Sequence, residues 1–89
     1  MPLTEASVPT LWRLARVIFD PVRQQAVLVY PEGVTLLNDT GAAILELCDG
    51  HRSIREIATI LGHRYQCDVL SDVTDYLSQL ADREFIRGD

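Results

Sequence analysis

The sequence predicts a small α+β domain in which a three-stranded antiparallel sheet is followed by three helices. Short β-branched and aromatic runs fill the first half, helix-capping residues with helical apolar spacing fill the second half, and 89 residues are enough for one domain. Residues 1–11 contain proline, serine and threonine without a sustained period. We therefore expect a flexible N-terminal arm over residues 1–11 and a single domain over residues 12–89.

Three strands are expected in the first half of the domain. Residues 14–19 and 26–30 are rich in β-branched and aromatic side chains, and the intervening Asp20-Pro21 suits a turn. Pro31-Glu32-Gly33 interrupts the second run. Residues 34–37 are then long enough for a third strand and too short for a helix.

Helix-capping residues open the first two predicted helices. Asn38 precedes an apolar stripe at helical spacing, and Gly50 is positioned to end that segment. Ser53 and Glu56 have the spacing of a capping box, and the apolar residues that follow recur at helical intervals. Gly62 is expected to close this second helix.

A longer amphipathic helix is expected after a linker over residues 63–67. Asp68 can cap it, and one face carries the apolar residues Val69, Val73, Tyr76, Leu77 and Leu80. The opposite face is acidic. Phe85 and Ile86 follow the helix, and we expect them to fold back onto the core.

The third strand is expected to lie at an edge of the small sheet. An edge strand keeps unpaired N–H and C=O groups that can pair with another extended chain. If Thr35 and Leu37 face the core, alternation places Val34 and Leu36 on the opposite surface. These two apolar side chains would then lie on a face that is usually polar, unless the domain itself covers both faces.

The charge balance argues against a protein held mainly by phosphate groups. The chain has 8 basic residues, all arginine, and 13 acidic residues, for a net charge of −5. Three helices beside a small sheet permit a winged-helix DNA binder as an alternative. The third helix would then enter the groove, but it carries aspartates and no basic residue, so phosphate would repel it.

Neither a membrane span nor a targeting segment is expected. The N-terminus lacks a basic region followed by an apolar run, and no stretch approaches about 20 apolar residues. We therefore expect a cytoplasmic protein without membrane contact. Cys48 and Cys67 should remain thiols there.

No catalytic or metal site is expected. Cys48 and His51, followed by His63 and Cys67, have a spacing that zinc permits, but Cys48 falls on the apolar stripe of the first helix and the capped second helix needs no metal to form. Neither cysteine has an orienting partner at a recognisable spacing. The acidic pairs lie on amphipathic helices, where such groups are usually solvated.

Several short motifs nevertheless lie at specific separations along the chain. They are Asp20-Pro21-Val22-Arg23, Pro31-Glu32-Gly33-Val34, Leu37-Asn38 with Thr40, Leu47-Cys48-Asp49-Gly50, Ser53-Ile54 with Glu56-Ile57, and Tyr76-Leu77. With these motifs the chain resembles the coenzyme PQQ synthesis protein D family, which belongs to the precursor-peptide recognition domains. Gly41 departs from the family pattern, in which alanine is usual at this position.

The resemblance implies a winged helix-turn-helix-like fold and a non-enzymatic peptide chaperone of pyrroloquinoline quinone biosynthesis. Such a protein would bind the ribosomal precursor peptide (PqqA) and present it to a radical S-adenosylmethionine enzyme (PqqE). The iron–sulfur cluster would belong to that enzyme, so no cofactor is expected in this chain. No nucleic-acid partner is implied.

In related domains the peptide adds as a strand beside the third strand, in a groove bounded by the third helix. The peptide-binding residues implied here are Val34, Thr35, Leu36, Leu37, Val69, Val73 and Tyr76. Val73 and Leu77 are better explained as core, whereas Val69 and Tyr76 lie nearer the margin of the apolar stripe. Arg52, Arg55 and Arg64 are candidates for contact with acidic groups of the peptide or enzyme.

A self-association module is the second alternative. The same exposed strand edge can pair two copies of the chain and give a homodimer. Peptide binding and self-association would then compete for one surface.

Overall fold

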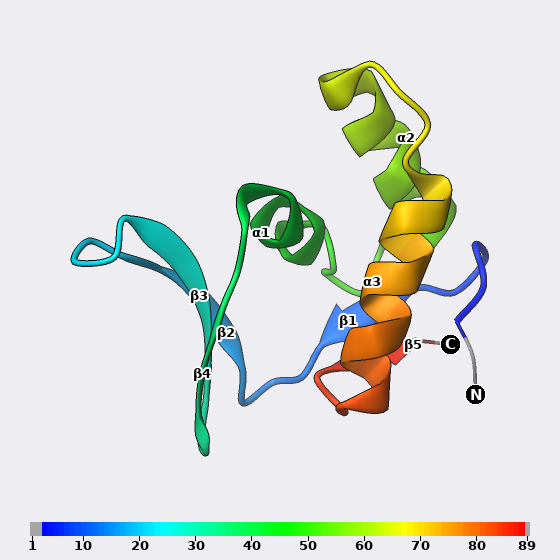
Figure 1. The fold of residues 1–89 in the computed structure, drawn as a ribbon. Coiled ribbons are helices and arrows are strands. Elements are labelled where there is room, and N and C mark those ends of the chain that lie inside the picture. Colours follow the sequence, from blue (N-terminus) through cyan, green and yellow to red (C-terminus); the bar gives the residue numbers. More distant parts are fainter. Residues whose placement is uncertain (1–2, 89) are drawn as a thin grey trace.

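The structure is a computed structural model that describes residues 3–88 (Figure 1). Its helices and strands, in chain order, are β1 (Pro9–Leu11), β2 (Arg16–Asp20), β3 (Gln25–Tyr30), β4 (Gly33–Leu36), α1 (Asp39–Glu46), α2 (Ile54–Tyr65), α3 (Leu70–Asp82) and β5 (Ile86–Gly88). The predicted α+β class, with a three-stranded antiparallel sheet and three helices, is confirmed. A second, two-stranded sheet formed by β1 and β5 was not predicted.

The three-stranded sheet has the order β2-β3-β4, so β2 and β4 are its edges. Leu28 of β3 lies opposite Val17 of β2 and Thr35 of β4. The strand predicted over residues 14–19 corresponds to β2, which begins at Arg16. It begins later than predicted because Trp12 and Ala15 close a turn in which the Ala15 N–H donates to the Trp12 carbonyl at 2.9 Å.

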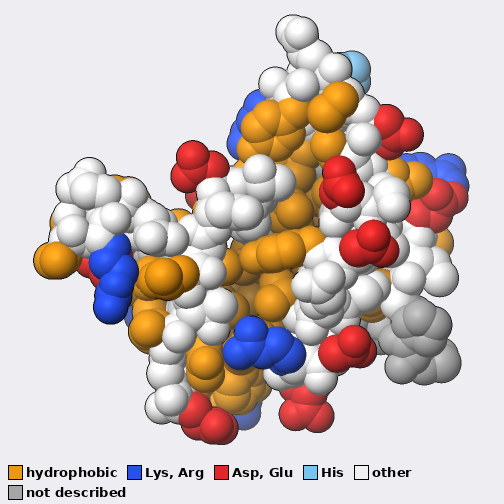
Figure 2. Space-filling model, viewed as in Figure 1, with side chains coloured by type: hydrophobic (Ala, Val, Ile, Leu, Met, Phe, Trp, Pro, Cys, Tyr) orange, Lys and Arg blue, Asp and Glu red, His pale blue; other side chains and the backbone are white. Residues whose placement is uncertain are grey.

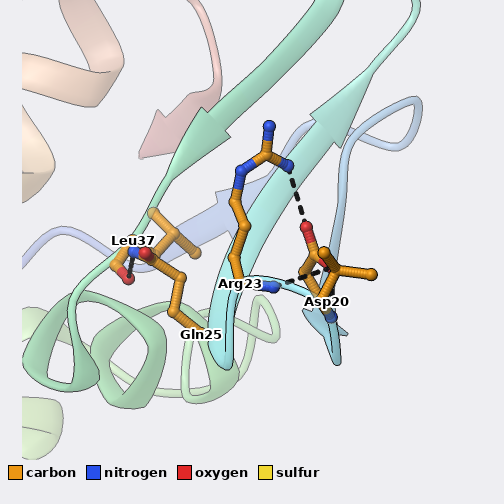
Figure 3. Close-up of polar contacts among 5 residues, drawn as sticks. Asp20, Arg23, Gln25 and Leu37 are labelled. Carbon is orange, nitrogen blue, oxygen red and sulfur yellow. Dashed lines mark hydrogen bonds and ion pairs between the residues drawn. The ribbon is translucent and has the colours of Figure 1, made fainter.

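Side-chain hydrogen bonds stabilise the end of the sheet at which β2 and β4 end and β3 begins (Figure 3). The Asp20 carboxylate accepts from the Val22 N–H at 3.0 Å and from Nη1 of Arg23 at 2.8 Å, which organises the β2–β3 turn. The guanidinium of Arg23 is the main cause of the lowered pKa of Asp20. Where β4 ends, Nε2 of Gln25 donates to the Leu37 carbonyl at 3.0 Å. The chain therefore leaves the sheet at a defined residue before α1 begins.

The start of α1 is confirmed and its end is earlier than predicted. Asn38 is the N-cap, and its side chain accepts from the Gly41 N–H at 2.7 Å. The last turn tightens, because the N–H groups of Leu47 and Cys48 donate to carbonyls three residues back, each at 3.1 Å. The helix thus ends at Glu46, before the expected Gly50.

The capping box of α2 is confirmed, but the helix continues past Gly62. It ends at Tyr65, where Gln66 adopts a left-handed conformation with φ of 57° and the Cys67 N–H returns to the Gly62 carbonyl at 3.1 Å. A Cβ at Gly62 would lie 2.9 Å from the Cys67 carbonyl oxygen. Gly62 therefore allows the Cys67 carbonyl to approach the helix closely, and it lies within the helix and not at its end.

The α3 helix follows the predicted pattern with a small shift at its start. Val69 is the N-cap residue, and the Asp68 carboxylate accepts from the Leu70 N–H at 3.1 Å. Val73 and Leu77 are buried in the core, as the sequence favoured. Phe85 and Ile86 fold back onto the same core, as expected.

The N-terminal segment differs from the flexible arm expected over residues 1–11. Residues 1 and 2 lie outside the described residues, but Leu3, Ser7 and Pro9 are buried and β1 pairs with β5. The Ile54 N–H donates to the Ser7 carbonyl and the Arg55 N–H to the Glu5 carbonyl, both at 2.9 Å. These contacts satisfy backbone N–H donors at the start of α2. The sequence of residues 3–11 has no hydrophobic period that could have indicated them.

The α1 helix connects the two halves of the molecule. It contacts β2 and β3 on one side and α2 on the other, while α2 and α3 pack together. In Figure 1, α1 accordingly lies between the three-stranded sheet and the α2–α3 pair. A single hydrophobic core runs through these layers. Within residues 3–88, no helix has the length and apolar character needed to cross a bilayer.

Candidate functional site

The outer edge of β4 carries unpaired backbone groups. The Leu37 N–H donates to the Ala26 carbonyl at 3.0 Å, which fixes the phase of the antiparallel β3–β4 ladder. Because hydrogen-bonded and non-hydrogen-bonded pairs alternate in such a ladder, Thr35 turns its main-chain groups toward β3. Val34 and Leu36 therefore direct their N–H and C=O groups away from the sheet, toward the free edge.

The side chains of β4 alternate as predicted. Val34 and Leu36 are each 52% exposed, on the outer face of the sheet. Leu36 lies in register with Val27 of β3 and through it with Ile18 of β2, which is 45% exposed. Thr35 is half-buried on the opposite face. The outer face of the sheet is therefore an apolar surface that ends at the free edge.

The structure divides the predicted peptide-binding residues into surface and core positions. Leu37, at 3% exposure, and Val73, at 1%, belong to the core and lie beneath the surface. Val69 and Tyr76 on the α3 side are half-buried and pack against that core. Val34, Thr35, Leu36, Val69 and Tyr76 thus have exposed atoms, whereas the other two can only support a surface.

Tyr76 reaches across from α3 to the first turn of α1. A Cβ built on Gly41 would lie 2.5 Å from the Tyr76 hydroxyl oxygen. Burial raises the pKa of Tyr76, with a smaller contribution from Cys48. The ring is thereby a neutral, half-buried wall between α3 and α1.

An apolar hollow separates the sheet from α3. Figure 2 shows hydrophobic side chains gathered in this hollow, with charged groups at its margin. A cavity of about 530 Å³ lies between the β3–β4 turn and the end of α3, and none of the predicted peptide-binding residues lines it. Aromatic and aliphatic side chains form most of the lining and charged groups complete it: Trp12, Tyr30, Ala81, Phe85, Ile86, Glu32, Arg83, Glu84 and Arg87.

The cavity lining includes residues that sequence reasoning did not assign to a site. The rings of Tyr30 and Phe85 are 4.7 Å apart, and the Arg83 guanidinium lies 4.9 Å from the centre of the Phe85 ring. The fold-back of Phe85 was the one available signal. Trp12 and Tyr30 had none, because only the tertiary packing brings them beside the end of α3.

The arginines chosen from the sequence lie away from this cavity. Arg52 forms an ion pair with Asp49 at 2.6 Å, and Arg55 forms one with Glu5. Arg64 is exposed near the end of α2. None of the three lines the cavity, whereas Arg83 and Arg87 do.

The cysteines do not form a metal-binding group in the described part of the chain. Residues 3–88 contain no cluster of three or more histidine, cysteine or acidic side chains that could hold a metal ion. Cys48 is buried, and its thiol donates to the Ile44 carbonyl at 3.3 Å, whereas Cys67 is exposed. Burial raises the pKa of Cys48 to about 12, which keeps it a neutral thiol at physiological pH.

Comparison with known proteins places this geometry in a family context. The family model described as coenzyme PQQ synthesis protein D matches residues 25–86. A "PqqA binding protein" of Rhodopseudomonas palustris (strain BisB5) is 40% identical over 94% of this chain and 85% of its own length. A "PqqA binding protein" of Methylococcus capsulatus is 35% identical over 98% of this chain and 95% of its own.

Two further relatives concern a longer protein. The "Bifunctional coenzyme PQQ synthesis protein C/D" of Methylorubrum extorquens is 41% identical over 85% of this chain, which corresponds to 20% of that protein. The solution NMR structure of the PqqD truncation of Methylobacterium extorquens PqqCD superimposes with a TM-score of 0.83 at 35% identity, covering 96% of this chain and 94% of that one. That truncation is described as a functional, stand-alone RiPP recognition element. With this agreement in sequence and in fold, the chain belongs to the coenzyme PQQ synthesis protein D family.

Proposed function

We propose that this protein binds the ribosomal precursor peptide of PQQ biosynthesis as an added strand on β4 and presents it to the radical S-adenosylmethionine enzyme of that pathway. The observation that carries the proposal is the free edge of β4, together with the apolar hollow between the sheet and α3 that Figure 2 shows. The printed names of the relatives, "PqqA binding protein", support the choice of peptide.

The main chain of β4 provides the register for such a strand. The N–H and C=O groups of Val34 and Leu36 would pair with the peptide backbone, each hydrogen bond contributing about 1 kcal/mol net. In an antiparallel pairing, peptide residues opposite Val34 and Leu36 would extend the outer apolar face, and the residue opposite Thr35 would point into the hollow.

The side chains around the hollow would supply specificity. Val69 and Tyr76 would contact peptide side chains directly from α3, while Leu37 and Val73 would support the surface from below. Arg83 and Arg87 at the cavity would meet polar or acidic groups of the peptide. Arg52, Arg55 and Arg64 do not line the cavity and remain candidates for contact with acidic groups of the peptide or the enzyme.

We also propose that the chain acts without catalysis, in the cytoplasm. The neutral, buried Cys48 thiol supports the first point, since it is a poor nucleophile. The winged helix-turn-helix-like description is part of the same proposal and draws support from the paired helices α2 and α3 beside a three-stranded sheet. Aspartates along α3 argue against DNA as the ligand.

The test is calorimetric titration with the synthetic full-length precursor peptide, using a matched pair of variants. Leu36→Asp places a charge at the β4 edge, and Val22→Asp makes the same change at a 91% exposed turn residue. We expect Leu36→Asp to weaken binding at least about tenfold, because a charge cannot be buried there without a partner. Val22→Asp should bind as the unmodified protein does.

Two results would contradict the proposal. One is that the unmodified protein shows no binding, and the other is that both variants bind equally well. Sedimentation across a concentration series, with and without the peptide, distinguishes peptide binding from the homodimer alternative, in which β4 pairs with a second copy of the chain. A tight dimer that the peptide does not dissociate would assign the edge to self-association.

A further inference from the structure

We propose that Gly41 is a positioning residue for Tyr76 and so sets the width of the groove between β4 and α3. This inference rests on the proposed function. It assigns a determinant of peptide selectivity to a glycine in α1 that does not itself face the peptide. The contact between the first turn of α1 and the Tyr76 ring carries the argument.

The space above Gly41 is already occupied. A Cβ at this position would lie 2.5 Å from the Tyr76 hydroxyl oxygen, 3.0 Å from Cζ of the same ring and 3.1 Å from Oδ1 of Asn38. Non-bonded heavy atoms make favourable contact near 3.5–4.0 Å, so any side chain at position 41 must displace a neighbour.

The backbone does not require glycine here. Gly41 lies inside α1, and its φ is not among the positive values found in residues 3–88. Glycine is a poor helix former, and alanine is the best one. Helix formation alone would therefore favour alanine at position 41. The close approach of the Tyr76 ring explains why glycine fits there better.

Of the two neighbours, Tyr76 is the one that can move. Oδ1 of Asn38 is held by the Gly41 N–H at 2.7 Å as part of the helix cap. The backbone of Tyr76 is fixed, since Val73 and Leu77 on either side are buried at 1% and 0% exposure. Its half-buried ring would therefore turn away from the first turn of α1.

The consequence concerns the size of the peptide side chain that the groove accepts. With glycine at position 41, the ring lies against the first turn of α1, and on this proposal the groove keeps room for a bulky apolar side chain of the peptide. With alanine, the displaced ring would occupy part of that room. We therefore expect the glycine to favour branched aliphatic or aromatic peptide residues.

The experiment compares four proteins: the unmodified chain, Gly41→Ala, Tyr76→Phe and the double variant. Titration with the synthetic precursor peptide should give about tenfold weaker binding for Gly41→Ala, the range expected when one methyl group overfills a packed site. The Tyr76→Phe variant should bind within about threefold of the unmodified chain, because the ring stays in place. The double variant should recover part of the loss, because the hydroxyl oxygen at 2.5 Å is gone while the ring carbon at 3.0 Å remains.

A measurement on the unmodified protein tests the contact without any substitution. Proton NMR should show a nuclear Overhauser effect between the α protons of Gly41 and the Tyr76 ring protons. Circular dichroism and thermal melting verify that each variant is folded.

The outcomes separate this inference from the proposed function. If the unmodified chain does not bind the peptide, the proposed function fails, and the inference built on it falls as well. If it binds and Gly41→Ala binds equally, or if Tyr76→Phe does not rescue the loss, the positioning role alone is wrong. Absence of the Overhauser effect also overturns it.

Discussion

A proline at Leu36 tests whether the main chain of β4 binds the peptide. Proline removes the N–H of residue 36 and adds ring atoms where that donor was. The Leu36 N–H points away from β3, so the change removes no bond within the sheet, and proline is tolerated at such edge positions. Thr35 already has the extended conformation that a following proline requires.

The expected size of the effect follows from one lost hydrogen bond. A typical bond contributes about 0.5–1.5 kcal/mol net, but a peptide carbonyl left unpaired costs roughly 1–3 kcal/mol. Because 1.4 kcal/mol corresponds to a tenfold change, Leu36→Pro should bind the precursor about five to a hundred times more weakly than its control. The control is Leu36→Ala, which also removes the leucine side chain but keeps the N–H.

The assay is calorimetric titration of both variants, with melting curves to verify that the sheet is intact. Trp12, the single tryptophan of the chain, lines the cavity and gives an independent fluorescence signal for its occupancy. Equal affinity of Leu36→Pro and Leu36→Ala, with both variants folded, would refute main-chain pairing at this edge. Side-chain contacts alone would then have to explain binding.

Four further predictions concern stability and reactivity. Iodoacetamide should modify the exposed Cys67 before the buried Cys48, as followed by mass spectrometry. The free energy of unfolding should fall between pH 9 and 12, because the pKa of the Cys48 thiol is near 9.0 in the unfolded chain and about 12 in the folded one. The Cys48→Ala variant should remove most of that pH dependence. Ser53→Ala should cost about 1 kcal/mol in urea unfolding because it removes the side-chain acceptor of the Glu56 N–H, and a cost near zero would show that the cap is not formed. Gly62→Ala should lower the melting temperature, although alanine favours helices, because its Cβ would meet the Cys67 carbonyl at 2.9 Å; a higher melting temperature would contradict this reason.

Local sequence signals predicted the helices and the central sheet well. The Ser53–Glu56 capping box and the Asn38 cap depend on residues three positions apart, so both are visible without tertiary information. The alternation of Val34 and Leu36 with Thr35 also follows from the period of a strand. The sequence left open whether the domain covers both faces of this strand, and the structure shows that Val34 and Leu36 are exposed.

The elements that the sequence did not predict depend on distant contacts. β1 and β5 each have three residues, and Thr10 pairs with Arg87 across nearly the whole chain. Gly62 looked like a helix end because its actual role, the approach of Cys67, is tertiary. The cavity lining was missed for the same reason, since Trp12 and Phe85 meet only after the chain has folded.

The β1–β5 pair has a consequence for how the domain can be joined to other proteins. Pro9 lies opposite Gly88, so the first and last strands of the described chain lie side by side, and Figure 1 shows β1 and β5 near α3 and away from the β2–β3 turn. A tether that continues from β1 or from β5 would start from the same side of the molecule, away from the β2–β3 turn. The fold is thus suited to being carried as a module within a longer polypeptide, the arrangement found in the bifunctional relative.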